Sequence, residues 1–180
     1  MESMKLLGRL GAAWGIIGVC LLILFAVYRL SGMAMTAFEI DLQWHHWLVL
    51  IANTIFMAYS EGYRGFQLAF APRVAARARH LLNHPKLLHV LLAPLFCMGY
   101  FHTTRKRLIV AYGLLLGVMV LILIYQQLGQ PWRGILDVGV SVGLGWGLFS
   151  LLWFSYQAMV AKSFRYSPGM PLDEQVKKPL

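Results

Sequence analysis

The residues with the most chemical potential gather in one stretch, residues 64–107. It carries eight of the sixteen lysines and arginines and four of the six histidines. Guanidinium groups bind phosphate through paired hydrogen bonds, so we consider a site for a lipid-linked phosphate. The simpler alternative is general contact with anionic lipid headgroups. The candidate lipid- or phosphate-binding residues are Arg73, Arg77, Arg79, Lys86, Arg105, Lys106 and Arg107.

The histidines of this stretch offer two further chemistries. His80 and His84 are four residues apart, a spacing that brings two ligands of one metal to one helix face. Membrane oxygenases with such pairs need several of them, and this chain has only six histidines. His89 and His102 are thirteen apart, a spacing typical of the ligands of two stacked haems in b-type cytochromes, so haem b is a possible cofactor. Each haem needs a second histidine from another helix: His84 could pair with His102, and only His45 or His46 could serve the other haem. Histidines hydrogen-bonded at the membrane interface are the alternative for all four.

Two carboxylates lie next to basic residues at helical spacing. Asp137 follows Arg133 by four residues, and Glu61 precedes Arg64 by three. A carboxylate inside a membrane is by default a functional candidate, for example in proton transfer. Both carboxylates fall near the ends of the expected spans, however, so we predict structural ion pairs. We expect no carboxylate in the middle of a span.

No other motif in the sequence points to catalysis. It contains neither a nucleophile elbow nor a phosphate-binding glycine loop. Cys20 and Cys97 are isolated within apolar runs, which argues against a zinc site or a disulfide framework. The sequence therefore leaves enzymatic activity uncertain and favours a protein that is not an enzyme.

The composition predicts an integral membrane protein. Hydrophobic residues make up 59% of the chain and charged residues 13%, whereas roughly 25% is usual in soluble domains. Apolar runs approach the ~20 residues that cross a bilayer. The net charge of +9 is explained by lysine and arginine on the cytoplasmic face, so we expect no nucleic-acid partner.

We expect an all-α fold with four transmembrane helices, at about residues 10–30, 44–63, 108–128 and 135–160. After the second span we expect a loop and then a basic amphipathic helix on the cytoplasmic surface. Pro72 suits its first turn, and Pro85 ends it. Residues 87–103 are apolar but short for a span, and Pro94 interrupts them. We interpret them as a re-entrant or interfacial hairpin.

The distribution of basic residues supports this topology. If residues 87–103 return to the same side, fourteen lysines and arginines share one face, and only Arg29 and Arg133 lie on the other. If residues 87–103 cross the membrane, each face holds eight lysines and arginines. Because cytoplasmic loops are enriched in lysine and arginine, we favour the first arrangement. It predicts a multi-pass protein of the bacterial inner membrane with both termini in the cytoplasm.

Small residues recur at helical spacing and predict close helix packing. Gly11, Gly15 and Gly18 lie near one face of the first span. Asn53, near the middle of the second span, needs a hydrogen-bonding partner and is expected to find it across a helix interface. The candidate packing residues are Gly113, Gly117, Gly139, Gly143, Gly147 and Asn53.

These observations lead to one fold prediction and three functional hypotheses. We expect a single helical membrane domain at residues 1–165 and a mobile cytoplasmic tail at 166–180. The first hypothesis is an accessory or structural subunit of a membrane complex, with anionic lipids and other membrane subunits as partners. The alternatives are a membrane redox protein with haem b and a carrier or enzyme for a lipid phosphate.

Overall fold

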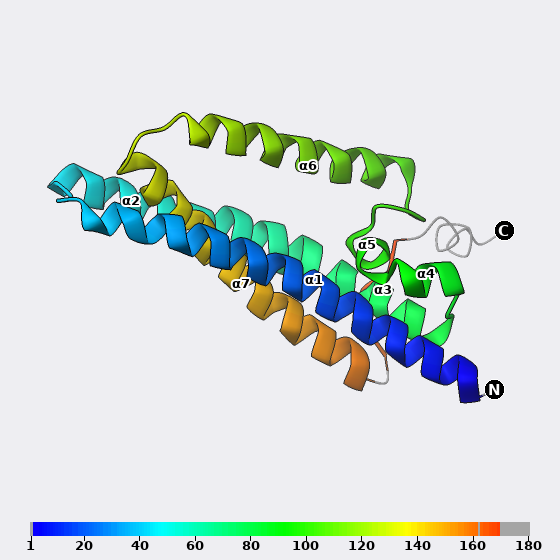
Figure 1. The fold of residues 1–180 in the computed structure, drawn as a ribbon. Helices are drawn as coiled ribbons and strands as arrows, with labels where there is room; N and C mark the ends of the chain where they lie inside the picture. The colour runs from blue at the N-terminus through cyan, green and yellow to red at the C-terminus, as the bar shows by residue number, and fades with distance from the viewer. Residues whose placement is uncertain (1, 162, 170–180) are drawn as a thin grey trace.

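The computed structural model describes residues 2–161 and 163–169, and this part of the chain is helical without strands. Figure 1 shows its arrangement. The elements are α1 (Glu2–Thr36), η1 (Ala37–Glu39), α2 (Trp44–Met57), η2 (Ala58–Phe70), α3 (Ala71–Asn83), α4 (Leu87–Leu91), α5 (Ala93–Met98), α6 (Arg105–Gln126) and α7 (Trp132–Val160).

Three helical stretches are long and apolar enough to cross a membrane. They are Met4–Glu39, Arg107–Gln126 and Trp132–Val160. They contain three of the four expected spans. The chain thus has the all-helical architecture and the long apolar helices of a membrane protein.

The loop expected after residue 63 is absent, because α2, η2 and α3 form one continuous helix. Its middle part, η2, is a π-helix, in which each backbone hydrogen bond joins residues five apart instead of four. The amide of Ala71 accordingly donates to the carbonyl of Phe66. The helix ends at Asn83, as predicted, because His84 leaves helical geometry before Pro85.

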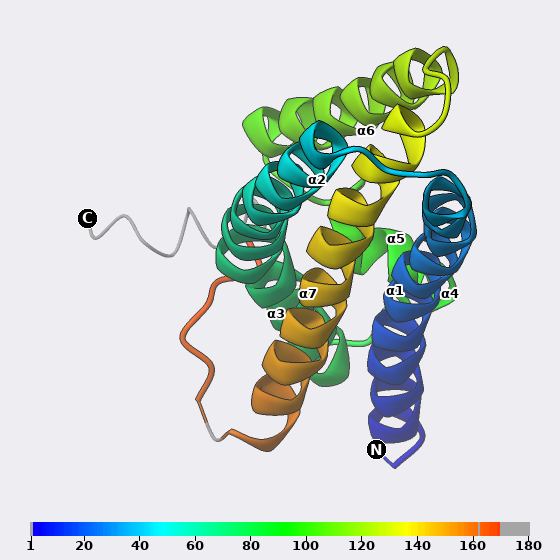
Figure 2. The same cartoon turned by 90° about the vertical axis from the view of Figure 1, so that its left-hand side faces the viewer.

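Three long helices form the core of the molecule. Helix α7 packs against α1 on one side and against α2, η2 and α3 on the other. Figure 2 shows α7 between these two neighbours. Asn53 of α2 donates a 3.1 Å hydrogen bond to the carbonyl of Ile135 in α7, which joins the two helices.

Helix α3 is not the expected surface helix. It packs against α1, α5 and α7, and eight of its thirteen residues are buried. Its alanines let neighbouring helices approach closely. The basic residues of α3 therefore do not prevent its burial. The buried residues are Ala71, Pro72, Val74, Ala75, Ala76, Arg77, Ala78 and Leu81.

The glycines of α1 face the end of α3 and the two short helices that follow. A methyl group added at Gly11 would lie 2.8 Å from Val90, and one added at Gly15 would lie 2.7 Å from the Cys97 sulfur. Gly18 is in contact with Pro94. Seven residues of α-helix, from Gly11 to Gly18, span about 10 Å. The α4–α5 segment therefore extends well along α1 before the chain turns back.

Three glycines of α7 face the continuous α2–η2 helix. Gly139 contacts Asn53, Gly143 lies against Glu61, and Gly147 contacts Phe66. All three glycines are buried. The absence of side chains on this face of α7 lets the two helix backbones come close together.

Helix α6 differs from the other long helices. It runs beside the core, with no described element packed closely against it (Figure 1). None of the residues in its apolar window is buried. Gly113 and Gly117 face open space. Its apolar surface is thus exposed in the described part of the chain.

Candidate functional site

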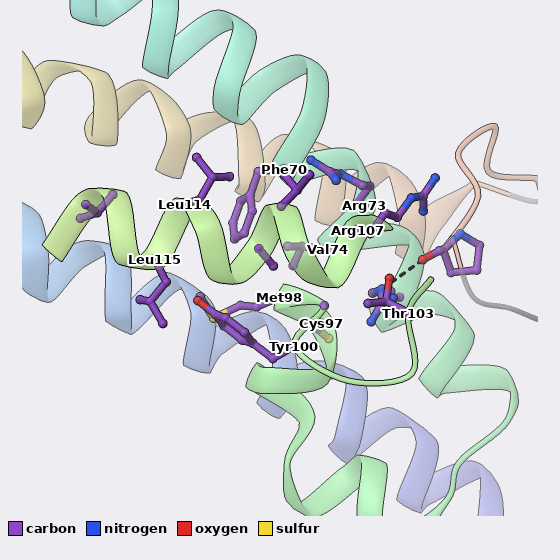
Figure 3. Close-up of a pocket in the computed structure, with 16 residues that line it drawn as sticks. Phe70, Arg73, Val74, Cys97, Met98, Tyr100, Thr103, Arg107, Leu114 and Leu115 are labelled. Carbon is purple, nitrogen blue, oxygen red and sulfur yellow. Dashed lines mark hydrogen bonds between the residues drawn. The ribbon is translucent and has the colours of Figure 1, made fainter. Parts of the chain in front are cut away.

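A pocket of about 260 Å³ lies between α6 and the core, beside α3 and α5. Figure 3 shows Arg73 and Arg107 close together at one end, and Leu114 and Leu115 farther along α6. The pocket therefore joins a cationic end to an apolar wall. Its lining is Phe70, Arg73, Val74, Arg77, Cys97, Met98, Gly99, Tyr100, Thr103, Arg107, Val110, Ala111, Leu114, Leu115, Val118 and Pro168.

Arg77 is buried, and its guanidinium holds the hairpin loop. Its Nη1 donates to the carbonyls of Phe96 (2.8 Å) and Phe101 (3.2 Å), and its Nη2 donates to that of His102 (3.2 Å). Its Nε donates to Pro168 at 3.0 Å. Burial lowers the pKa of Arg77 to about 10, so it stays charged at neutral pH. Four of its five N–H groups are used, which makes it mainly structural.

Arg73 and Arg107 are exposed and have donors to spare. Within the described chain, the only hydrogen bond of Arg73 runs from its Nε to the carbonyl of Ala69, and Arg107 has none. Desolvation and, second, the positive charge of Arg107 lower the pKa of Arg73. Among the described residues, no carboxylate lines the pocket. In this part of the chain the two guanidinium groups thus form a cationic pair without a carboxylate beside it, which is suited to an anion.

The segment after α7 reaches the cationic end of this pocket. The carbonyl of Pro168 accepts the hydrogen bond from Arg77, and Gly169 lies in contact with the Arg107 guanidinium. Tyr166 packs edge-on against Phe154 of α7, with ring centroids 5.4 Å apart. These contacts place the start of the expected tail, residues 166–169, against the folded domain. The rest of the tail lies outside the described residues.

The other basic candidates do not line this pocket. Arg79 donates hydrogen bonds to the carbonyls of Ala158 and Ala161 at the end of α7. Lys86 and Arg105 are exposed. The side chain of Lys106 lies outside the described atoms. The structure therefore brings Arg73, Arg77 and Arg107 together and leaves Arg79, Lys86 and Arg105 outside the pocket.

The histidine candidates form two ring pairs. The rings of His80 and His84 are stacked, with centroids 4.9 Å apart. His89 is buried between Phe96, at 4.6 Å, and the edge of His102, at 4.7 Å. Ligands of two stacked haems lie at different depths, whereas the His89 and His102 rings are in contact with each other. In the described part of the chain, no three His, Cys, Asp or Glu residues are grouped to hold a metal ion.

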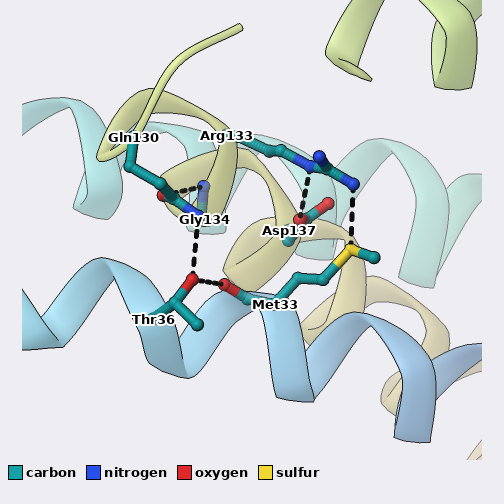
Figure 4. A network of polar contacts seen from close by, with 6 residues as sticks. All are labelled: Met33, Thr36, Gln130, Arg133, Gly134 and Asp137. Atoms are coloured by element: carbon teal, nitrogen blue, oxygen red, sulfur yellow. Dashed lines mark hydrogen bonds and ion pairs between the residues drawn. The ribbon is translucent and has the colours of Figure 1, made fainter.

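One of the two expected ion pairs is formed. Figure 4 shows Arg133 between Asp137 and Met33, which links the start of α7 to the end of α1. The Arg133 Nε lies 4.0 Å from a carboxylate oxygen of Asp137. Among the described residues, Glu61 and Arg64 make no ion pair. They lie in the π-helix, where the wider turn removes the shared face that a three-residue spacing has in an α-helix.

Sequence reasoning did not identify the apolar and polar residues that complete the pocket. Tyr100 and Thr103 come from the loop after α5, and Val110 comes from α6. The only signal for this loop is the position of Gly99, which adopts a left-handed conformation (φ 91°) at the end of α5. Its approach to α6 depends on the tertiary fold.

Comparison with protein families, with curated proteins and with solved structures finds no match to this chain. Its function is therefore argued from its own residues.

Proposed function

We propose that this protein binds a phosphate-bearing anionic lipid between α6 and the helical core. The observation that carries the proposal is the pocket with two guanidinium groups that have donors to spare at one end and apolar side chains along its wall. A phosphate would accept hydrogen bonds from Arg73 and Arg107. An acyl chain would lie along α6 against Leu114 and Leu115. The class of ligand is thus an anionic amphiphile.

The proposal includes a membrane topology with four crossings. The fourth crossing is the apolar part of α2 and η2, and α4–α5 is a re-entrant hairpin. Contact of Pro94 with Gly18, near the middle of the apolar run of α1, supports this depth. The predominance of basic residues on one face supports cytoplasmic termini. The bacterial inner membrane is the proposed location.

Lipid retention tests the proposed site. The protein, extracted in mild detergent and exchanged into phosphatidylglycerol, is compared by native mass spectrometry with the variant Arg73→Gln/Arg107→Gln. Each lost charged hydrogen bond contributes about 1.5–3 kcal/mol, so we expect at least a tenfold loss of bound lipid. Phosphatidylcholine and inorganic phosphate, as second and third probes, separate recognition of the whole lipid from recognition of phosphate alone.

The matched control is Lys86→Gln/Arg105→Gln, which removes the same charge from exposed residues outside the pocket. It should retain phosphatidylglycerol like the wild type. Equal losses in the two double variants would show general attraction to the charged surface and would overturn the proposed site.

The second candidate function is that of an accessory subunit in a membrane complex. It is favoured by α6, whose Gly113 and Gly117 have no neighbours within the described residues. Small residues allow a helix of another protein to approach closely. The test is crosslinking from Gly117→Cys in native membranes, with Leu121→Cys as a second position on α6. Adducts with lipid alone at both positions would contradict this candidate.

A further inference from the structure

Glu61 lies deeper than its place in the sequence suggests. The expected second span ended beside it, but the helix continues to Asn83. A methyl group added at Gly143 would lie 3.0 Å from Glu61 Oε2. Gly143 is eleven residues from Trp132, the first residue of α7, or about 17 Å along a helix long enough to cross a membrane. Glu61 therefore faces the interior part of α7 rather than either end.

The carboxyl group of Glu61 has no polar partner at this depth. Its Oε2 is buried without a hydrogen bond, and within the described chain Glu61 has no ion pair. The α7 residues that meet η2 here are uncharged: Gly143, Trp146 and Gly147. The indole N–H of Trp146 is donated to Gln67 at 2.8 Å.

Nearby charges do not compensate a carboxylate at this position. Arg64, the basic residue nearest in sequence, is exposed and lies outside ion-pair distance. Asp137, on α7, is six residues from Gly143, about 9 Å along the helix, and faces Arg133. An isolated carboxylate in hydrocarbon costs several kcal/mol or more, whereas the neutral acid avoids that cost.

The π-helix makes this position distinctive. Segments of π-helix frequently occur at functional sites, and Glu61 lies in the first turn of η2. The missing side chain at Gly143 provides the space that its carboxyl group occupies. We propose that Glu61 is a proton-binding site in the membrane interior, held as a neutral carboxylic acid against Gly143 at neutral pH. This inference is independent of the lipid pocket.

Labelling with dicyclohexylcarbodiimide tests the proposal. This apolar reagent accepts the proton of a carboxylic acid on one nitrogen while the carboxyl oxygen adds to its central carbon, so ionised carboxylates in water react poorly. We expect one adduct per chain at neutral pH, located at Glu61 by peptide mass spectrometry. The adduct should disappear in Glu61→Gln and persist in Asp137→Asn. An adduct that persists in Glu61→Gln would contradict the proposal.

Infrared spectroscopy decides the case in which the reagent does not reach Glu61. A protonated carboxylic acid has a C=O stretch separate from the bands of a carboxylate. The difference spectrum between wild type and Glu61→Gln at neutral pH should contain this band, and it should shift in heavy water. A carboxylate band in its place would overturn the proposal, whatever the labelling result. Because glutamine has nearly the same shape, the variant is expected to fold.

Discussion

Helices α7 and α6 carry similar glycine patterns in opposite surroundings. On α7, Gly139, Gly143 and Gly147 are buried against the continuous α2–η2 helix. On α6, Gly113 and Gly117 have the same four-residue spacing, yet they face open space. The pattern thus indicates where a helix can be approached closely, but it does not identify the neighbour.

The same contrast extends to the polar residues of the two regions. In the packed core, Arg77 and Asn53 each donate to backbone carbonyls of another element. On α6, Arg107 makes no hydrogen bond within the described chain, and its positive charge faces that of Arg73. A closely packed core therefore stands beside a helix that has few contacts with the rest of the described chain. Paired substitutions in the two regions test this division.

The largest effect is expected for Arg77→Met compared with Arg107→Met. Arg77→Met leaves the carbonyls of Phe96, Phe101 and His102 without their donor inside the fold. We expect a loss of about 3–5 kcal/mol in the free energy of unfolding, measured by SDS titration in mixed micelles. Arg107→Met should stay within about 0.5 kcal/mol of wild type. Equal effects would show that the two arginines do not differ as described.

A smaller difference is expected for Gly147→Leu compared with Gly117→Leu. At Gly147 the new side chain meets the ring of Phe66 and must separate α7 from η2. Such overpacking costs about 1–3 kcal/mol. At Gly117 the side chain enters open space, so the same SDS titration should give a value near that of the wild type. A strong loss for Gly117→Leu in the isolated protein would mean that α6 packs against the core.

Removal of one cross-helix hydrogen bond should have a modest effect. Asn53→Leu eliminates the bond to the carbonyl of Ile135. Hydrogen bonds between membrane helices contribute about 0.6 kcal/mol on average, so we expect a loss of that order. The control is Gln126→Leu at the exposed end of α6, which should change the unfolding free energy less. A larger loss in the control would reverse the comparison.

The smallest effect concerns pH. Burial and, second, the nearby His102, Lys86 and Arg77 lower the pKa of His89. The folded protein therefore favours the neutral ring, and its contribution to stability is present above the ordinary histidine pKa of about 6.5 and is lost as the pH falls below it. On mild acidification, the melting temperature of the wild-type protein should fall more than that of His89→Phe.

The control for this pH dependence is His84→Phe, because His84 is exposed. It should keep the acid sensitivity of the wild type. If His84→Phe removes that sensitivity and His89→Phe does not, the buried ring is not its source.

Sequence reasoning was most successful where a rule depends on neighbours along the chain. The long apolar runs predicted the helices that contain α1, α6 and α7, because a helix satisfies its own backbone in an apolar medium. Pro85 predicted the end of α3 at Asn83. These outcomes require no knowledge of which helices meet.

The predictions were wrong where residues distant in sequence bind a buried charge or keep a segment helical. The arginines of α3 favoured a surface helix, but Arg77 is buried because carbonyls of residues 96–102 accept its hydrogen bonds. We expected a loop after residue 63, but packing against α7 keeps this segment helical as η2. Glu61 consequently lies within a continuous helix and not at the end of one.

Composition and apolar periodicity by themselves determined that this chain is helical and has helices suited to a membrane, since both properties depend on local backbone and solvation energetics. The tertiary structure alone decided which arginines share a pocket, which glycines have neighbours and how deep Glu61 lies. These features depend on how one helix is aligned with another, and contacts between residues far apart in the sequence set that alignment.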